Sequence, residues 1–215
     1  MSKVVCHQSI SRDGFTAGPN QSLENPIGEG GMRLHQWMFD TAAFMRMQGL
    51  PGGSEGPDSD VVEELASNAN VGAYVMGRNM FDPGPRGEWD ESWKGPWGDD
   101  PPYHAPTFVL THHPRAPVPM QGGTTFYFVT DGIESALRQA KEAAGDKDVQ
   151  IGGGADTVRQ FLRAGYLDEL NLHLAPVVLG SGEGLFHDVG DLELTITRVI
   201  DSPTVTHLTY RVGLR

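Results

Sequence analysis

The order of apolar segments along the chain leaves few folds open to it. Short runs rich in β-branched and aromatic residues alternate with segments whose apolar residues recur at helical spacing, and two more strand-like runs close the sequence. Strands are predicted at 3–11, 71–76, 107–111, 125–129, 148–151 and 168–179, with the closing pair at 192–200 and 204–213. Helices are predicted at 32–48, 60–69, 131–145 and 155–165. This order predicts an α/β fold, with a mostly parallel central sheet, helices on both faces and an antiparallel C-terminal edge.

Length and composition predict one domain that spans residues 1–215. A chain of this size buries a large core without disulfides, and its one cysteine, Cys6, has no second cysteine to pair with. The single cysteine, the polar start and the lack of a long apolar stretch predict a cytoplasmic protein without a membrane partner. The formal net charge of −12 argues against nucleic acid as a partner, because such affinity depends on basic surface. An anionic ligand must therefore be held by a few basic residues or by backbone N–H groups.

Three consecutive glycines, Gly152, Gly153 and Gly154, separate the predicted strand at 148–151 from the predicted helix at 155–165. A strand, a glycine turn and a helix N-terminus together form an anion site, because free N–H groups and the helix dipole attract negative charge. Glycine also allows a pyrophosphate to lie against the backbone. The spacing here is GxGxxT rather than GxGxxG, so the same residues equally fit a tight turn that binds nothing.

A second glycine turn, LGSGEG at 179–184, is similar to the GxGxG with which methyltransferases hold S-adenosylmethionine. A methyltransferase would need a helix at 184–195. The residues that follow the turn, LFHDVGDLELTITRV, instead alternate between apolar and polar in the manner of strands. We therefore interpret this turn as mainly structural and keep the methyltransferase as a third hypothesis.

A third glycine lies in YVMGRNMFD, where an apolar strand runs into Gly77, Arg78 and Asn79 before a short helix. A guanidinium beside a glycine at the start of a helix suits a phosphate ester, although a surface arginine in a salt bridge is the commoner case. A dinucleotide such as NADP carries a pyrophosphate and a 2′-phosphate, so it would use two such places.

Four segments in this order make the chain resemble the dihydrofolate-reductase-like family: SRDGFTAG, MGRNMFD, FVLTHHPR and IGGGADTVRQFLRAGYLDELNLHLAPVVLGSGEGLF. The similarity runs essentially end to end, and it is strongest to the reductase domain of the riboflavin-biosynthesis deaminase/reductase, the RibD C-terminal domain. The zinc signature of the deaminase, HxE with PCxxC, is absent from the sequence, so the chain resembles a stand-alone reductase domain.

The resemblance implies NADPH as the hydride donor, a small-molecule substrate and a homodimer. It also implies a set of cofactor contacts. These are Ser9, Thr16 and Ala17 for the nicotinamide, Gly77, Arg78 and Asn79 for the phosphates, Thr111 and His112 for the adenosine ribose, and Gly152, Gly153, Gly154, Ala155, Asp156 and Thr157 for the pyrophosphate. A dinucleotide close to the backbone would explain why the turn at 152–154 carries no side chain.

The substrate side of the site follows less clearly from the sequence. Dihydrofolate reductases place an acid in the helix after the first loop, whereas this segment reads RLHQWMFD and its Asp40 comes late, which weakens the prediction of folate as substrate. Trp37 is predicted to line the substrate pocket, with a tryptophan of the 82–106 segment as a lid, although core packing explains each tryptophan equally well. The proton would come from water or from Asp13, a residue type that more often stabilises a turn.

The favoured function is therefore an NADPH-dependent reductase of a small heteroaromatic, carbonyl or imine compound, of the riboflavin-type pyrimidine or pteridine-like class. A cofactor-binding protein of the same fold without productive catalysis is the main alternative. The eight histidines show no HExxH or comparable spacing, so no metal site is predicted.

Overall fold

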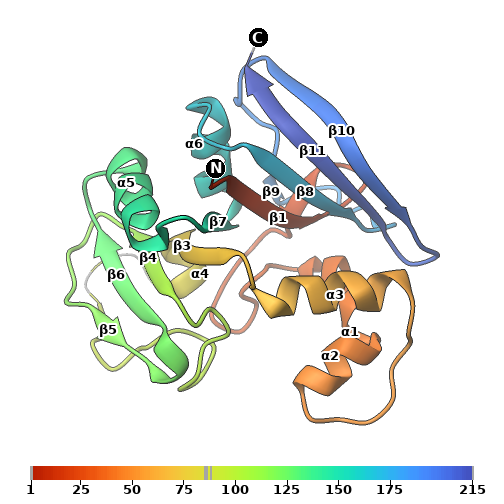
Figure 1. Cartoon of the computed structure of the whole chain (residues 1–215), viewed down its shortest axis with the longest axis horizontal. Helices are drawn as coiled ribbons and strands as arrows, with labels where there is room; N and C mark the ends of the chain where they lie inside the picture. The colour runs from red at the N-terminus through yellow and green to blue at the C-terminus, as the bar shows by residue number, and fades with distance from the viewer. Residues whose placement is uncertain (1, 85–86, 88, 215) are drawn as a thin grey trace.

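The computed structural model describes residues 2–84, 87 and 89–214, and over these residues the chain builds one nine-stranded sheet (Figure 1). The strand order is β10-β11-β8-β1-β7-β3-β4-β6-β5. Each of the six central strands runs parallel to its neighbours among them. They are β8 (Glu169–Leu174), β1 (Val4–Ile10), β7 (Asp148–Gly153), β3 (Val71–Gly77), β4 (Pro106–Leu110) and β6 (Thr125–Val129).

Antiparallel strands close both edges of the sheet. The hairpin of β10 (Leu192–Asp201) and β11 (Thr206–Leu214) pairs with β8, which confirms the predicted antiparallel C-terminal edge. The opposite edge is the short β5 (Val118–Pro119), which was not predicted. A separate two-stranded sheet joins β2 (Phe15–Ala17) to β9 (Glu183–Gly184).

Helices cover both faces of the sheet, as the sequence pattern predicts. Figure 1 shows α1, α2 and α3 grouped away from α5, which lies beside β3 and β4. None of the helices in the described part of the chain is both long and apolar enough to cross a membrane. The helical elements are η1 (Gly31–His35), α1 (Gln36–Phe39), α2 (Ala42–Met47), α3 (Pro57–Ser67), α4 (Arg78–Phe81), η2 (Gln121–Gly123), α5 (Ile133–Ala144) and α6 (Ala155–Arg163).

Successive side chains of β3 point to opposite faces of the sheet, and each set belongs to a core on its own face. Ala73 and Val75 are fully buried among apolar residues of α5 and α6. Tyr74 and Met76 point to the other face, where they pack around Phe81 of α4. Successive strand residues face opposite sides, so a run without polar residues indicates a strand that is covered on both.

The predicted continuous helix at 32–48 is wrong, because the segment forms η1, α1 and α2 in succession. The break lies at Thr41, which adopts an extended backbone (φ −79°, ψ 150°). Its hydroxyl accepts a hydrogen bond from the backbone N–H of Phe44 at 3.2 Å, so Thr41 caps a new helix rather than continuing the old one.

Two other predicted boundaries also shift. The helix predicted to begin at Asp60 begins at Pro57, where the missing N–H of proline costs nothing in a first helical turn. The strand predicted over 168–179 ends at Leu174, shortly before Pro176, which has no N–H to donate to a strand ladder.

The tryptophan-rich segment between α4 and β4 is packed onto the sheet rather than poised as a lid. Trp89 donates its indole N–H to the carbonyl of His113 at 2.9 Å, and Trp93 donates to that of Phe81 at 2.8 Å. Both rings, with Trp97, pack against the aromatic core on this face. Positions 85, 86 and 88 of the segment lie outside the described residues.

Candidate active site

A cleft of about 760 Å³ opens at the carboxyl ends of the parallel strands. Its lining includes residues at or just beyond the ends of five strands, namely Ser9 of β1, Gly77 of β3, Leu110 of β4, Thr130 after β6 and Gly152 of β7. Open α/β sheets bind ligands in this position, because the loops that follow the strands diverge there and leave a crevice. The topology therefore accounts for the place of the cleft before any side chain is considered.

The cleft brings together every residue that the resemblance assigns to the cofactor. These residues come from segments far apart in the sequence, and each borders the same space: Ser9, Thr16, Ala17, Gly77, Arg78, Asn79, Thr111, His112, Gly152, Gly153, Gly154, Ala155, Asp156 and Thr157. Their contact with NADPH stays a prediction. Their shared location is what the structure adds.

The first glycine turn leads directly from β7 into α6. Gly153 has φ +127°, a backbone conformation that side chains disfavour, and the following peptide bond to Gly154 is cis. Gly154 caps α6, and a Cβ built on it would meet no described atom within 4 Å. Gln8 donates its side-chain N–H to the carbonyl of Gly152 at 3.2 Å and supports the turn from β1. The start of α6 therefore borders the cleft, with open space beside Gly154.

Gly77 allows the starts of α4 and α6 to approach each other. A Cβ on Gly77 would lie 2.5 Å from the hydroxyl oxygen of Thr157, closer than real Cβ atoms come to their neighbours. The absence of a side chain here thus has a packing reason, in addition to any role in phosphate binding.

Arg78 borders the cleft with a side chain that is held on several sides. Its guanidinium donates to the carbonyl of Gly87 at 3.1 Å and lies 4.3 Å from the ring centroid of Trp89. The carboxylate of Asp82 is 3.9 Å away, and only 12% of the Arg78 side chain is exposed. A preorganised guanidinium of this kind suits a phosphate, because little side-chain entropy remains to be lost on binding.

Arg159 is a cleft residue that the sequence reasoning missed. It donates to the carbonyl of Gly184, and its guanidinium lies 3.2 Å from the carboxylate of Asp156. Asp156 is an acid at the start of α6, so Arg159 offsets a charge that would otherwise repel an anion there. Arg159 lies three residues after Asp156, a spacing that places the two side chains on one helix face, and this spacing is the sequence signal for its presence at the cleft.

Asp13 does not reach the cleft. Its carboxylate accepts hydrogen bonds from the backbone N–H groups of Leu179 at 3.1 Å and Gly180 at 2.7 Å. Hydrogen bonds from Ser11 and from these two backbone groups lower the pKa of Asp13 to about 2. A carboxylate that stays ionised and joins two loops is a poor proton donor. The prediction that Asp13 supplies the proton is therefore corrected, and its role is to stabilise the loops.

Trp37 lies behind the cleft rather than in its wall. Its side chain is buried between the rings of His173 and His207, whose centroids are 5.0 and 4.9 Å from its own. The indole N–H donates to the hydroxyl oxygen of Ser9 at 3.3 Å. Trp37 therefore supports a cleft residue from the core, and the prediction that it lines the pocket is corrected.

The second glycine turn is structural. A Cβ on Gly182, which has φ +136°, would overlap the carbonyl oxygen of Ala17, so this glycine lets the turn before β9 approach β2 closely. Residues 184–195, all of them described, contain no helix. The methyltransferase hypothesis required one and is therefore wrong. Among the described residues no group of three or more histidine, cysteine or acidic side chains is arranged to hold a metal ion.

The strand order, the helices on both faces and the cleft at the carboxyl ends of the strands define a domain of the dihydrofolate-reductase-like fold. The chain belongs to the RibD C-terminal domain family, whose profile matches residues 2–208.

Solved structures with the same fold include proteins of riboflavin biosynthesis. A putative riboflavin biosynthesis protein from Shewanella sp. PV-4 superposes with a TM-score of 0.60 at 21% identity, over 98% of this chain and 99% of that one. The riboflavin biosynthesis reductase Rib7 of Saccharomyces cerevisiae gives 0.53 at 12%, over 99% and 89%. Dihydrofolate reductase from Enterococcus faecalis, complexed with NADP(H), gives 0.50 at 13%, over 98% and 96%.

A similarity in sequence reaches an uncharacterized protein of Bacillus subtilis, YyaP. The two chains are 37% identical over 81 residues, which is 36% of this chain and 43% of YyaP. The matched segment thus spans less than half the length of that relative.

Proposed function

We propose that this protein is an NADPH-dependent reductase that transfers hydride to a small heteroaromatic, carbonyl or imine compound. The observation that carries the proposal is that one cleft, at the carboxyl ends of the strands, gathers all the residues implied for a nicotinamide dinucleotide. Membership of the RibD C-terminal domain family supports it. So does the bound NADP(H) of a structural neighbour, the E. faecalis dihydrofolate reductase.

The residues present fit a dinucleotide phosphate. Gly154 leaves open the space that a Cβ would enter, and the N–H groups of the first turn of α6 would receive the pyrophosphate there. Among the described residues, Arg78 and Arg159 each bring a guanidinium group to the cleft of a chain whose net charge is −12. The 2′-phosphate of NADPH would bind Arg78, which favours NADPH over NADH.

NADPH supplies the hydride when bound, so the task of the chain is to align donor and acceptor and to exclude water. Ser9 accepts the indole N–H of Trp37, which leaves its own O–H to donate toward the cleft. The substrate would lie beyond the nicotinamide, where the lining continues through Pro26, Ile27 and His35. Burial lowers the pKa of His35, so this ring is neutral near pH 7.

The substrate class we propose is a riboflavin-type pyrimidine or a pteridine-like compound, by analogy with the family. Homodimerisation stays a prediction of the same resemblance. The alternative is a protein that binds the cofactor without turnover. It differs from a reductase in one observable, because only a reductase would oxidise NADPH in the presence of an acceptor.

The test is a denaturation experiment with NADPH followed by a panel of pyrimidine, pteridine and simple imine or carbonyl acceptors, with the loss of NADPH absorbance as readout. Stabilisation by NADPH together with acceptor-dependent oxidation supports the reductase. Stabilisation without oxidation by any acceptor supports the binding protein, and no stabilisation at millimolar NADPH contradicts both.

A further inference from the structure

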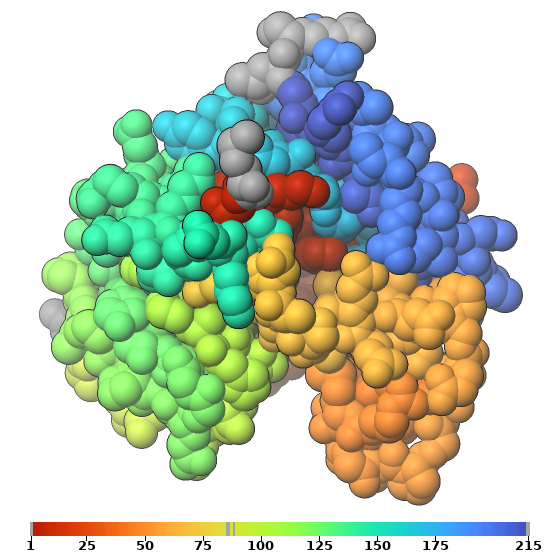
Figure 2. Space-filling model, viewed as in Figure 1, coloured from red at the N-terminus to blue at the C-terminus, as the bar shows by residue number. Residues whose placement is uncertain are grey.

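A second hollow lies on the sheet face between α3 and the β10–β11 hairpin, and of its described lining residues it shares His7 with the cofactor cleft. Figure 2 shows it in the middle of the face, with the red N-terminal strand visible between the yellow-orange end of α3 and the blue hairpin. The groove has a volume of about 510 Å³ and is lined by β1, by the end of α3 and by the starts of β7 and β8. We call it the α3 groove.

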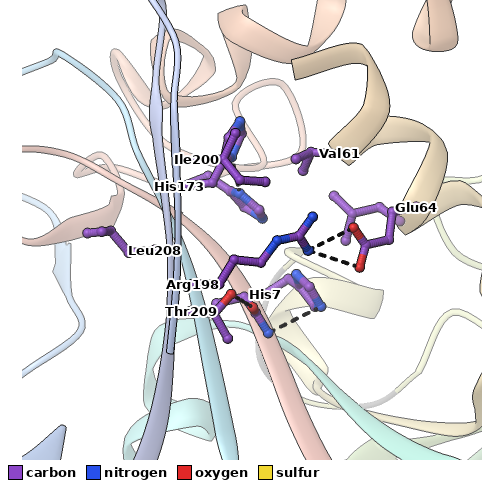
Figure 3. A pocket seen from close by; sticks show the side chains of 11 residues that line it. His7, Val61, Glu64, His173, Arg198, Ile200, Leu208 and Thr209 are labelled. Atoms are coloured by element: carbon purple, nitrogen blue, oxygen red, sulfur yellow. Dashed lines mark hydrogen bonds and ion pairs between the residues drawn. The ribbon is translucent and has the colours of Figure 1, made fainter. Parts of the chain in front are cut away.

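The α3 groove has a narrow floor of about 30 Å³, which is about twice what a single water molecule needs and can take the two polar atoms at the edge of a small ligand. The floor and the groove share His7, Asn171, Arg198 and two residues of α3, so the two spaces adjoin. Figure 3 shows the rings of His7 and His173 at this floor, with the Arg198 guanidinium beside them and directed at Glu64.

Two buried nitrogen atoms at the floor have no hydrogen-bond partner among the described residues. They are Nε2 of His173 and Nδ1 of His7. The His173 residue is only 5% exposed. A buried polar atom without a partner costs about 1–3 kcal/mol, so these two atoms indicate a ligand or a bound water.

A hydrogen-bond chain determines the role of the His173 atom. Nε2 of His207 lies 3.0 Å from the carboxylate of Asp58, which accepts only, so this nitrogen carries the proton. In a neutral ring Nδ1 of His207 is then an acceptor, and it lies 2.7 Å from Nδ1 of His173. The proton of His173 is therefore on Nδ1, and its Nε2 presents a lone pair to the floor.

A second chain determines the role of the His7 atom. Asn171 donates from Nδ2 to the carboxylate of Glu169 at 3.2 Å and accepts the hydroxyl of Thr209 at 2.7 Å. This orientation directs Nδ2 also at Nε2 of His7, 3.5 Å away, which makes that nitrogen the acceptor. Nδ1 of His7 then carries the proton and donates to the floor.

Both rings are neutral at pH 7, as these assignments require. Burial lowers the pKa of His7 to about 4 and holds the pKa of His173 well below its usual range. The floor therefore offers one acceptor and one donor on two rings that are stacked 5.7 Å apart.

We propose that the α3 groove binds an uncharged, planar cyclic amide, whose N–H would donate to His173 and whose carbonyl would accept from His7. Three of the described residues that line the groove are acidic (Glu64, Asp148 and Glu169) and one is basic (Arg198). Lys3 pairs with Glu169 at 2.9 Å, which still leaves the acidic groups in the majority, so an anionic ligand is disfavoured. The ring itself would lie in the wider groove, where the apolar side chains of Val5, Leu65 and Val71 suit its flat face.

The Arg198–Glu64 ion pair borders the entrance to the floor. Its two atoms are 3.0 Å apart, and the side chains are 53% and 63% exposed. An exposed ion pair contributes about 0–1 kcal/mol, so the guanidinium can move aside for a ligand at little cost.

The test is a ¹⁵N NMR titration of the histidine side chains with 2-pyridone, a planar cyclic amide. N-methyl-2-pyridone serves as the control, because it keeps the ring and the carbonyl while a methyl group replaces the N–H donor. We expect 2-pyridone to shift the Nε2 resonance of His173, and the N-methyl compound to bind at least tenfold more weakly. His173 is the informative residue because, unlike His7, it does not line the cofactor cleft.

The starting spectrum is itself a test, since the proposal requires the Nδ1–H tautomer of His173 and the Nε2–H tautomer of His207. The variant His173→Phe should lower the affinity for 2-pyridone at least tenfold, whereas His187→Phe, at an exposed position outside the groove, should not. An absent shift of His173 at saturating 2-pyridone, an equal response to both compounds or the opposite tautomer would overturn the proposal and leave a buried water at the floor. None of these readouts needs NADPH, so failure here is separate from failure of the proposed reductase.

Discussion

Replacing Gly154 by valine separates a binding role of the first glycine turn from a folding role. Gly154 has φ −68° and ψ −173°, an extended backbone that valine readily adopts. Its Cβ would meet no described atom within 4 Å. Glycine is only moderately favoured as a helix cap, so we expect the stability of the free protein to change by less than about 1 kcal/mol.

The same side chain would occupy the space above the N-terminus of α6, where the pyrophosphate is proposed to lie. Hydrogen bonds to charged groups contribute about 1.5–3 kcal/mol each, so the loss of one or two weakens NADPH roughly 10- to 100-fold or more. At a concentration near 1,000 times the parent Kd, NADPH adds about 4.1 kcal/mol to the parent. A variant with 100-fold weaker binding then keeps about 1.4 kcal/mol.

The assay is urea denaturation with and without NADPH, on the parent, Gly154→Val and the matched control Gly213→Val. Gly213 lies in β11 away from the cleft, and a Cβ there would make only ordinary contacts at 3.8 Å. We expect the control to keep its full response to NADPH. A folded Gly154→Val protein with parental NADPH affinity would refute the assignment of this turn to the cofactor.

Three further changes probe other parts of the structure. Arg78→Ala should weaken NADPH by roughly one to two orders of magnitude and NADH by less, measured by titration; equal losses would move Arg78 to the shared pyrophosphate. Burial lowers the pKa of His7 to about 4 from 6.5, so the unfolded chain takes up more protons as the pH falls below 6.5. The free energy of unfolding should therefore be full above pH 6.5 and drop by on the order of 2 kcal/mol by pH 5. This loss would lower the urea midpoint, and the midpoint of His7→Phe should fall less over the same pH range. Gly182→Ala should destabilise the fold by more than about 1 kcal/mol through its positive φ and its overlap with Ala17, and an unchanged Tm would contradict the structural role of that turn.

Much of the fold follows from local sequence patterns. The apolar run of β3 predicts a strand, and the helical periodicity of α5 and α6 predicts two helices. These patterns are strong because each element packs against the core along its whole length, so every core-facing position is apolar or small. The break at Thr41 was missed because helical periodicity continues through it, and only the cap hydrogen bond to Phe44 reveals where one helix ends. Boundaries that depend on a single hydrogen bond escape a periodicity argument.

The candidate site could be predicted where glycine and helix signals coincide, and not where a side chain depends on distant partners. The turn at 152–154 was found because its glycines precede a helix. Trp37 was misplaced because its burial depends on His173 and His207, which lie far along the chain. Asp13 was misplaced because its partners belong to a loop more than 160 residues away.

Amide hydrogen exchange of the unmodified protein, with and without saturating NADPH, examines the proposed cofactor site without any substitution. We expect slower exchange in the segments that line the cleft, 77–80, 110–113 and 152–160, and unchanged exchange in the β10–β11 hairpin. S-adenosylmethionine should leave the same amides unaffected. Binding of NADPH without protection of 152–160, or no binding at millimolar concentration, would contradict the proposal that this cleft holds the hydride donor.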